Sequence, residues 1–396
     1  MTTFENPALE EAATRPPFWR DLRVVRAVIQ IVAVIVIAAI GYILWFNLVN
    51  NLERQGITTG FGFLDQPVGV DIAGSDLSPG AALWRALLVG VTNTFALVAA
   101  GLPLLTIIGV LVGIGRLSSN WLVAKAASVY VETLRNIPPL LVIFIAFYVL
   151  VLPLPPPSDP ANPFGLFVIS NLRITVPWFE TVEGASGGFG LVLLAAVAVA
   201  AAVWVVRTRH NERTGQPHHR AVLAAVAVIG IAALGWQALG RPVRISIPQV
   251  DGRVVTGGLG GFGSYFAMLI ALVLYTASHV AEIVRGSILA VSKGQTEAAN
   301  ALALSGLQRL RFVVLPQAMR IAIPPVINQY LNFAKNTSLG IAVGYAEVTL
   351  IAFQAIGNGQ PAPQLILLLM AAYLSFSLTI SLIVNYLNRR LRYVTR

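Results

Sequence analysis

Residues 294–306 read GQTEAANALALSG, and this polar stretch directly follows an apolar run, Tyr265–Leu289, that is long enough to span a bilayer. Thr296 is a good N-cap residue, Glu297 would lie in a first turn where the helix dipole favours an anion, and Gly306 can close a C-terminus. The sequence therefore predicts a short, rigid helix at the end of a membrane span. An ordinary connecting loop is the alternative, and the capping signals alone do not decide between the two.

The chain around this stretch is too apolar for a soluble fold. Of its 396 residues 56% are hydrophobic and 11% are charged, with a mean hydropathy of +0.76, whereas a soluble domain carries about a quarter charged residues. Side chains of this composition need lipid as part of their solvent. The sequence thus predicts an all-α integral membrane protein. The absence of cysteine excludes disulfides, thiolate metal sites and cysteine nucleophiles.

Apolar runs of about 17 to 25 residues predict eight membrane-spanning helices. The first is too long for the apolar part of a signal peptide, so we expect it to remain as a membrane helix. The second is long enough to be tilted, and the seventh is interrupted by Pro316, Pro324 and Pro325. The eight runs are Val24–Phe46, Leu83–Ile114, Val129–Leu152, Gly190–Val206, Ala221–Ala238, Tyr265–Leu289, Val313–Ala334 and Leu365–Leu387.

Lysine and arginine are distributed unequally between the two sides of these spans. With the N-terminus placed inside, nineteen of them fall in cytoplasmic segments and six in external ones. Because basic residues collect in cytoplasmic loops, this asymmetry predicts that both termini are cytoplasmic if the number of spans is even. The same rule accounts for the formal net charge of +10 without a nucleic-acid partner.

The segment between residues 153 and 263 differs from its surroundings. It holds two external stretches rich in Pro and Gly, and between them two spans without any ionisable residue, which favours packing or lipid contact over transport chemistry. We interpret residues 153–263 as an insertion into an older unit. It would separate a first core part, residues 81–152, from a second one with a cytoplasmic tail, residues 264–396. Residues 1–80 would hold the N-terminal tail, an extra helix and an external loop.

Several motifs together resemble the permeases of bacterial ATP-binding-cassette (ABC) importers, in particular the polar amino-acid branch. Glu297-Ala298-Ala299, followed at a fixed distance by Leu315-Pro316, resembles the EAA loop of that family, with Ala303 where Gly is usual and Val313 where Ile is usual. The extra first helix and the insertion resemble the general L-amino-acid permease sub-branch. Further similar strings are Tyr275–Gly286, Val314–Arg320, Pro324–Asn328 and Lys335–Leu339, with looser matches at Val91–Thr94 and Val131–Pro138.

The resemblance implies a type I importer core of five helices, in a bacterial inner membrane, that pairs with a second homologous permease subunit. The polar helix would be a coupling helix seated in a cleft of a dimer of ATPase subunits. A periplasmic amino-acid-binding protein and an L-amino acid substrate are implied as well, although the sequence does not specify which amino acids are carried. The residues expected to couple to the ATPase are Gly294, Gln295, Glu297, Ala298, Ala299, Leu304, Gly306 and Arg309.

The chain is expected to be a transporter subunit and not an enzyme. None of its three lysines is followed by Ser or Thr, so it has no Walker A loop. We therefore expect no cofactor in this chain, and ATP and Mg²⁺ on the partner ATPase. No catalytic arrangement of Ser with His, no paired aspartates and no HExxH motif lies in the predicted spans, which disfavours an intramembrane enzyme.

Ionisable side chains inside spans are candidates for substrate contact, because each costs about 2.5–3.5 kcal/mol to insert. Glu282 and Lys335 would offer one anion and one cation to a zwitterionic amino acid. Alternatively, Glu282 pairs with Arg285, three residues further along the helix, near the cytoplasmic interface. The remaining candidates, which would supply hydrogen bonds, are Asn328, Asn336, Thr337 and Ser338.

An ion-coupled secondary amino-acid transporter is the main alternative function. Such transporters usually show two related halves with matching broken helices, and no internal repeat is visible here. A further interpretation concerns Gly109 and Gly113, whose GxxxG spacing favours close helix packing, which could involve the partner permease.

Overall fold

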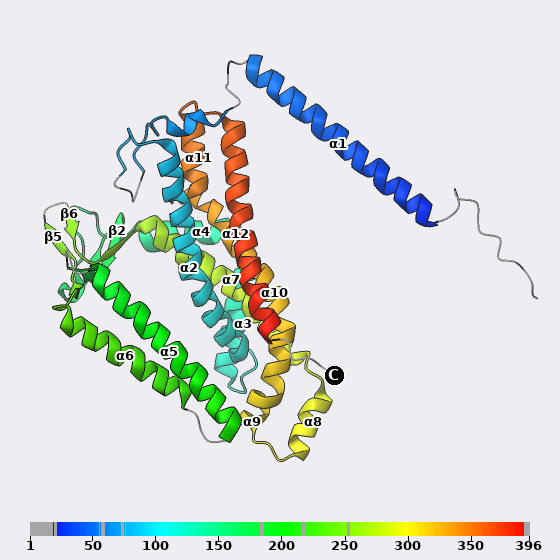
Figure 1. Cartoon of the computed structure of the whole chain (residues 1–396), viewed down its shortest axis with the longest axis vertical. Helices are drawn as coiled ribbons and strands as arrows, with labels where there is room; N and C mark the ends of the chain where they lie inside the picture. The colour runs from blue at the N-terminus through cyan, green and yellow to red at the C-terminus, as the bar shows by residue number, and fades with distance from the viewer. Residues whose placement is uncertain are drawn as a thin grey trace, which may run out of the picture.

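The computed structural model describes residues 19, 22–54, 56, 60–72, 75, 77–182, 186–214, 219–251 and 254–391. Within them, seven helices are long and apolar enough to cross a membrane, or eight if one bent pair counts as a span, and each predicted span coincides with one of these. In Figure 1, α5 and α6 run side by side as a pair beside the bundle that holds α2, α7, α10 and α12, and α1 is set apart from both. The helices are α1 Leu22–Arg54, α2 Leu83–Gly115, α3 Trp121–Arg135, α4 Pro139–Ile145, α5 Ser186–Thr214, α6 Arg220–Ala238, α7 Gly263–Leu289, α8 Lys293–Ala301, α9 Gly306–Arg309, α10 Leu315–Asn336, α11 Val348–Gly357 and α12 Ala362–Leu391.

Helix α7 is the centre of the bundle, where it packs against α2, α3, α4 and α10. Small residues allow α2 to approach it closely. A Cβ atom on Gly109 would lie 2.6 Å from Val280 Cγ1, and one on Gly113 would lie 2.7 Å from the Ala281 carbonyl oxygen. The GxxxG pair therefore packs inside this chain, which corrects the expectation that it could meet a partner permease.

The third predicted span, Val129–Leu152, is broken. Helix α3 ends at Arg135, and the chain bends by 109° before α4 and the π-helical turn Ala146–Val151. Pro138 disfavours the helical conformation at Ile137, and two consecutive prolines cannot donate the backbone bonds that would continue α3. Pro139 fits the first turn of α4, where a missing N–H is tolerated.

The seventh predicted span is continuous despite its prolines. A π-helical turn, Leu310–Val314, joins α9 to α10, and α10 continues through Pro324 and Pro325. In a membrane, neighbouring helices and local adjustments satisfy the backbone groups that such prolines release. A 3-10 helix, Thr337–Val343, follows α10. The sequence did not predict α11, because ten residues are too few to span a bilayer.

Short strands form a cap that an all-α prediction leaves out. They make one three-stranded sheet with the order β1-β2-β7 and two ribbons, β3-β4 and β5-β6. The labelled strands in Figure 1 lie at one end of the α5–α6 pair, and α8 and α9 lie at the opposite end of the bundle. The strands are β1 Val168–Ile169, β2 Arg173–Val176, β3 Trp178–Thr181, β4 Val243–Ser246, β5 Gln249–Asp251, β6 Val254–Thr256 and β7 Leu259–Phe262.

Candidate functional site

The predicted polar helix exists as α8, but its ends differ from the prediction. Ser292, with extended backbone, occupies the N-cap position, so Thr296 lies inside the helix. Gly306 does not close α8; it begins α9, behind the N-cap Ser305. There the Ser305 hydroxyl accepts from the Gln308 backbone N–H, and the Gln308 side chain accepts from the Ser305 N–H. This capping box starts a new helix where a C-terminus was expected.

Helix α8 ends in a tight left-handed turn at Ala303, whose φ is 55°. The Ala303 N–H donates to the Asn300 carbonyl oxygen over 2.9 Å, and the Leu304 N–H donates to the Ala299 carbonyl oxygen over 3.1 Å. This pair of bonds is the Schellman motif, which normally places glycine at the left-handed position. The bend therefore forms at the position where the EAA pattern has Gly, although alanine occupies it.

Two side-chain hydrogen bonds connect α8 to the helices that follow it. The Gln317 amide on α10 donates to Gln295 Oε1 over 3.0 Å, and the Arg309 guanidinium on α9 donates to Asn300 Oδ1 over 2.7 Å. Ala299 is buried, and α8 packs against the π-helical turn before α10. Because α8 is held at both of its ends, a displacement of α8 would be transmitted to α10.

The residues predicted to couple to an ATPase divide between the two sides of this unit. Ala299 faces inward and Leu304 and Arg309 are half-buried, so these three hold the turn together. Glu297 makes no ion pair or side-chain hydrogen bond within the part of the chain that the structure describes. The residues that are exposed and available to a partner are Gly294, Gln295, Glu297, Ala298 and Gly306.

Large apolar side chains surround the turn between α8 and α10. Leu302 and Leu307 are 74% and 81% exposed, and Phe312 is 63% exposed. A shallow hollow of about 460 Å³ is lined by residues 307, 308, 310–312 and 315. This end of the bundle thus exposes apolar side chains beside the polar helix α8.

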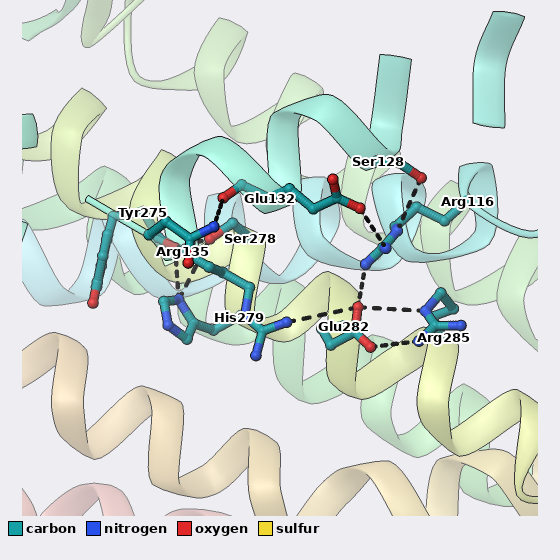
Figure 2. A network of polar contacts seen from close by, with 10 residues as sticks. Arg116, Ser128, Glu132, Arg135, Tyr275, Ser278, His279, Glu282 and Arg285 are labelled. Atoms are coloured by element: carbon teal, nitrogen blue, oxygen red, sulfur yellow. Dashed lines mark hydrogen bonds and ion pairs between the residues drawn. The ribbon is translucent and has the colours of Figure 1, made fainter. Parts of the chain in front are cut away.

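Glu282 on α7 lies at the centre of a cluster of guanidinium groups (Figure 2). Arg285 donates to it from the same helix, with Nη2 2.6 Å from Oε1. Arg116 at the end of α2 forms an ion pair with the same carboxylate, and Arg135 at the end of α3 approaches Oε2 to 3.8 Å. The alternative that Glu282 pairs with Arg285 is confirmed, and the carboxylate also joins three helices.

The acidic side chain at the rim of this cluster is more exposed to water than the one at its centre, so its ion pair contributes less. Glu132 on α3 lies 3.7 Å from Arg116 and has a side chain that is 69% exposed, whereas the Glu282 side chain is 25% exposed. Arg116 also approaches Ser128 Oγ at 3.4 Å. With three arginines and two glutamates, the cluster carries one net positive charge. Arg116 and Arg135 could not be assigned to it from the sequence, because only the packing of α2 and α3 on α7 brings them there.

The other predicted substrate residues lie on α10 and the 3-10 helix after it. Asn328 and Lys335 are exposed and seven residues apart, which is about two helical turns and places them on one face. Asn336 is half-buried at the end of α10. Thr337 and Ser338 donate to the Ala334 and Lys335 carbonyl oxygens, each over 2.8 Å. Among the described residues, no hydrogen bond or ion pair joins Glu282 to any of these five.

Sequence reasoning missed one ionisable residue in the apolar core, Glu347. Its side chain is fully buried, caps α11 by accepting from the Leu350 N–H over 3.0 Å, and accepts from the Tyr373 hydroxyl on α12 over 2.7 Å. Thr349 donates to it over 3.2 Å. An acidic residue in front of an apolar run was the available signal.

Comparison with known proteins places the chain among membrane transport subunits. Residues 221–393 match the family described as binding-protein-dependent transport system inner membrane component. The chain is 37% identical over 375 residues to the general L-amino acid transport system permease protein AapQ of Rhizobium johnstonii, covering 93% of this chain and 92% of that protein. It is 36% identical over 370 residues to the putative amino-acid ABC transporter permease protein YhdX of Escherichia coli, covering 93% and 94%.

A third relative is the glutamate/glutamine/aspartate/asparagine transport system permease protein BztB of Rhodobacter capsulatus. It is 35% identical over 411 residues, covering 94% of this chain and 95% of that protein. Identities of this size over nearly the full length of both chains show common family membership. The chain belongs to the family of inner-membrane components of binding-protein-dependent transport systems.

Proposed function

We propose that this chain is the permease subunit of an ATP-driven importer of L-amino acids, and that it moves its substrate by alternating access. The names of all three relatives refer to amino-acid transport. The observation that carries the proposal is the unit made by α8 and α10: an exposed polar helix, closed by a Schellman turn and hydrogen-bonded to a membrane helix through Gln295 and Gln317. A transporter that is driven by a separate ATPase in the cytoplasm needs such a connection between its ATPase-facing surface and its membrane helices.

Three kinds of partner complete the proposed importer. A dimer of ATPase subunits, which would hold ATP and Mg²⁺, contacts α8 from the cytoplasm through Glu297 and the exposed leucines beside it. A second homologous permease completes the pathway, and a periplasmic binding protein delivers the amino acid. With α8 in the cytoplasm and an even number of spans, both termini are cytoplasmic as well.

The cluster around Glu282 would then act as a junction at the same side of the membrane as α8. Its carboxylate joins α2, α3 and α7, so separating these helices would require the ion pairs to break. Lys335 and Asn328, on the exposed face of α10, are proposed to contact substrate. Thr337 and Ser338 would hold the end of α10 in place. Contact between Glu282 and substrate stays a prediction.

Purification from native membranes tests the proposal. The tagged chain is isolated in mild detergent, its partners are identified, and ATPase activity is measured with and without amino acids and the binding protein. We expect an ATPase and a second permease to copurify and amino acids to stimulate hydrolysis. A chain that purifies alone and moves amino acids in liposomes without ATP would overturn the proposal in favour of ion coupling.

The role of α8 is tested separately with Glu297→Ala. Glu297 is exposed and has no side-chain partner among the described residues, so the variant should insert and fold normally. ATP-driven uptake should nevertheless fall about ten-fold or more, because a charge-assisted contact is worth about 1.5–3 kcal/mol. Glu53→Ala, an exposed position on α1, is the matched control and should leave uptake unchanged. Normal uptake with Glu297→Ala would contradict the coupling role.

A further inference from the structure

The ribbon formed by β3 and β4 has one apolar and one polar face. Phe179 lies opposite Ile245, and Glu180 lies opposite Arg244. Since successive side chains of a strand point to opposite faces, Phe179 and Ile245 share one face and Glu180 and Arg244 share the other. Phe179 and Ile245 are each 66% exposed, while Arg244 pairs with Glu180 over 3.4 Å. The polar face also carries Trp178, which lies opposite Ser246 and is 50% exposed. The charged pair is thus confined to one face, and the face of Phe179 and Ile245 is uncharged and uncovered.

The polar face is the one that meets the rest of the cap. Ser246 follows Arg244 on that face, and its hydroxyl accepts a hydrogen bond from the Gly258 N–H over 3.1 Å. A Cβ atom on the neighbouring Gly257 would lie 2.7 Å from the same hydroxyl oxygen. The cap thus covers part of the polar face, and the apolar face points away from it.

The ribbon is attached directly to the ends of two membrane spans. β3 ends five residues before α5 begins, and β4 begins five residues after α6 ends. The pairing continues toward the spans, because the Val182 N–H donates to the Pro242 carbonyl oxygen over 2.9 Å. The Trp236 indole on α6 donates to the Val243 carbonyl oxygen over 2.9 Å, which ties the ribbon to the last turn of that helix. These tethers keep the ribbon beside the ends of α5 and α6.

We propose that the β3–β4 ribbon lies flat on the bilayer at the end of the bundle opposite α8, with Phe179 and Ile245 inserted into the lipid. The ribbon adjoins α5 and α6, which pack mainly against each other and leave most of their apolar surface uncovered by the rest of the chain. A two-stranded ribbon alone is marginally stable in water, so its exposed apolar face needs a partner. Amphipathic elements at the ends of spans satisfy this need in the interfacial region, where aromatic rings are preferred.

The occupant that the proposal names is the phospholipid of that leaflet, and not a protein. The inference requires only that α5 and α6 cross the membrane, so it stands or falls independently of the amino-acid substrate and of ATP coupling. Under this proposal, both the ribbon and the helices α5 and α6 hold the predicted insertion, residues 153–263, at a fixed depth in the bilayer.

Spin labels on single cysteines test the proposal without background, because the chain has no cysteine. The two neighbouring variants Ile245→Cys and Arg244→Cys place nitroxides on opposite faces of one strand, and Arg244→Cys removes only an exposed ion pair of small value. Phe179→Cys and Glu180→Cys repeat the comparison on the other strand. The full chain, with whatever subunits copurify, is placed in nanodiscs of phosphatidylethanolamine and phosphatidylglycerol, and collisions with oxygen and with a water-soluble nickel chelate are measured.

We expect labels at 245 and 179 to collide with oxygen and to be shielded from the chelate, and labels at 244 and 180 to show the reverse. Access of the chelate to position 245 would mean that water covers the apolar face and would overturn the proposal. Shielding of position 245 from both reagents would mean that a protein covers it, and would overturn it equally. Oxygen-dominated collisions at both 244 and 245 would refute the flat, one-sided orientation.

Discussion

Replacing Ala303 with glycine should strengthen the end of α8. Ala303 has a φ of 55° in the Schellman turn, and a left-handed conformation costs an L-residue with a Cβ roughly 1–2 kcal/mol. Glycine removes this strain but adds about 0.4–1 kcal/mol of chain entropy to the opened state. The difference leaves a net gain of about 0.5–1 kcal/mol, which corresponds to roughly two- to five-fold slower local opening.

Hydrogen–deuterium exchange of peptides that cover residues 293–306 measures this opening in the intact complex. Ala301→Gly is the matched control, because Ala301 lies in the last helical turn of α8, only two residues away. There the same substitution should accelerate exchange, since glycine in a helix costs about 0.5–1 kcal/mol relative to alanine. Ala303→Val should accelerate exchange further, because a β-branched residue at positive φ is more strained than alanine.

The test is that the two glycine variants change the exchange rate in opposite directions, slower for Ala303→Gly and faster for Ala301→Gly. If Ala303→Gly accelerates exchange as Ala301→Gly does, then the turn at Ala303 does not store strain and the argument is refuted. If exchange slows and transport also changes, the stiffness of this turn contributes to coupling.

Three further perturbations concern the packing of the helices. Glu282→Gln should destabilise the chain by about 2–3 kcal/mol, because three guanidinium groups then converge without a negative charge between them. Glu132→Gln, at the exposed rim, should change stability by at most about 1 kcal/mol. Thermal unfolding in detergent distinguishes the two variants, and equal effects would contradict the central position of Glu282. Gly113→Ala should lower the stability of the chain by about 1–3 kcal/mol, because the new Cβ atom pushes α2 away from α7. Gly115→Ala should be tolerated, because its Cβ atom would have no neighbour closer than 3.6 Å. Similar melting temperatures for the two variants would contradict the close approach of α2 to α7. Glu347→Ala should cost about 2–4 kcal/mol, because it removes the cap of α11 and the carboxylate that accepts from the Tyr373 and Thr349 hydroxyls. An unchanged melting temperature would show that this network is not formed.

The membrane spans could be predicted from the sequence because a span is a matter of length and apolar composition. The break after Arg135 could have been predicted too, since Pro138 and Pro139 stand in the middle of the apolar run, but length alone favoured a continuous helix. The strands could not be predicted, because strands of two to four residues form only when they pair with segments far along the chain, as Val176 pairs with Leu259.

The candidate site was predictable to a similar extent. The polar stretch before Gly306 carried enough capping signals to indicate a helix, yet its true N-cap, Ser292, lies four residues before Thr296, a usual error at helix ends. Glu282 was recognised because a charge inside a span is unusual. Its partners Arg116 and Arg135 come from other helices, and only tertiary packing brings them to it.

The pairing of β2 with β7 brackets residues 177–258, the larger part of the predicted insertion, as a cassette that could be excised. Val176 and Leu259 are direct cross-strand neighbours, and Cα atoms in such pairs lie about 4.5–5.5 Å apart. A two-residue turn could therefore reconnect the two strands as a simple hairpin once residues 177–258 are removed. Since the cassette carries two spans, its loss or gain leaves the sidedness of every other helix unchanged. The junction between Val176 and Leu259 is therefore a site where a fluorescent or affinity domain could be inserted without reversing the topology of the remaining spans.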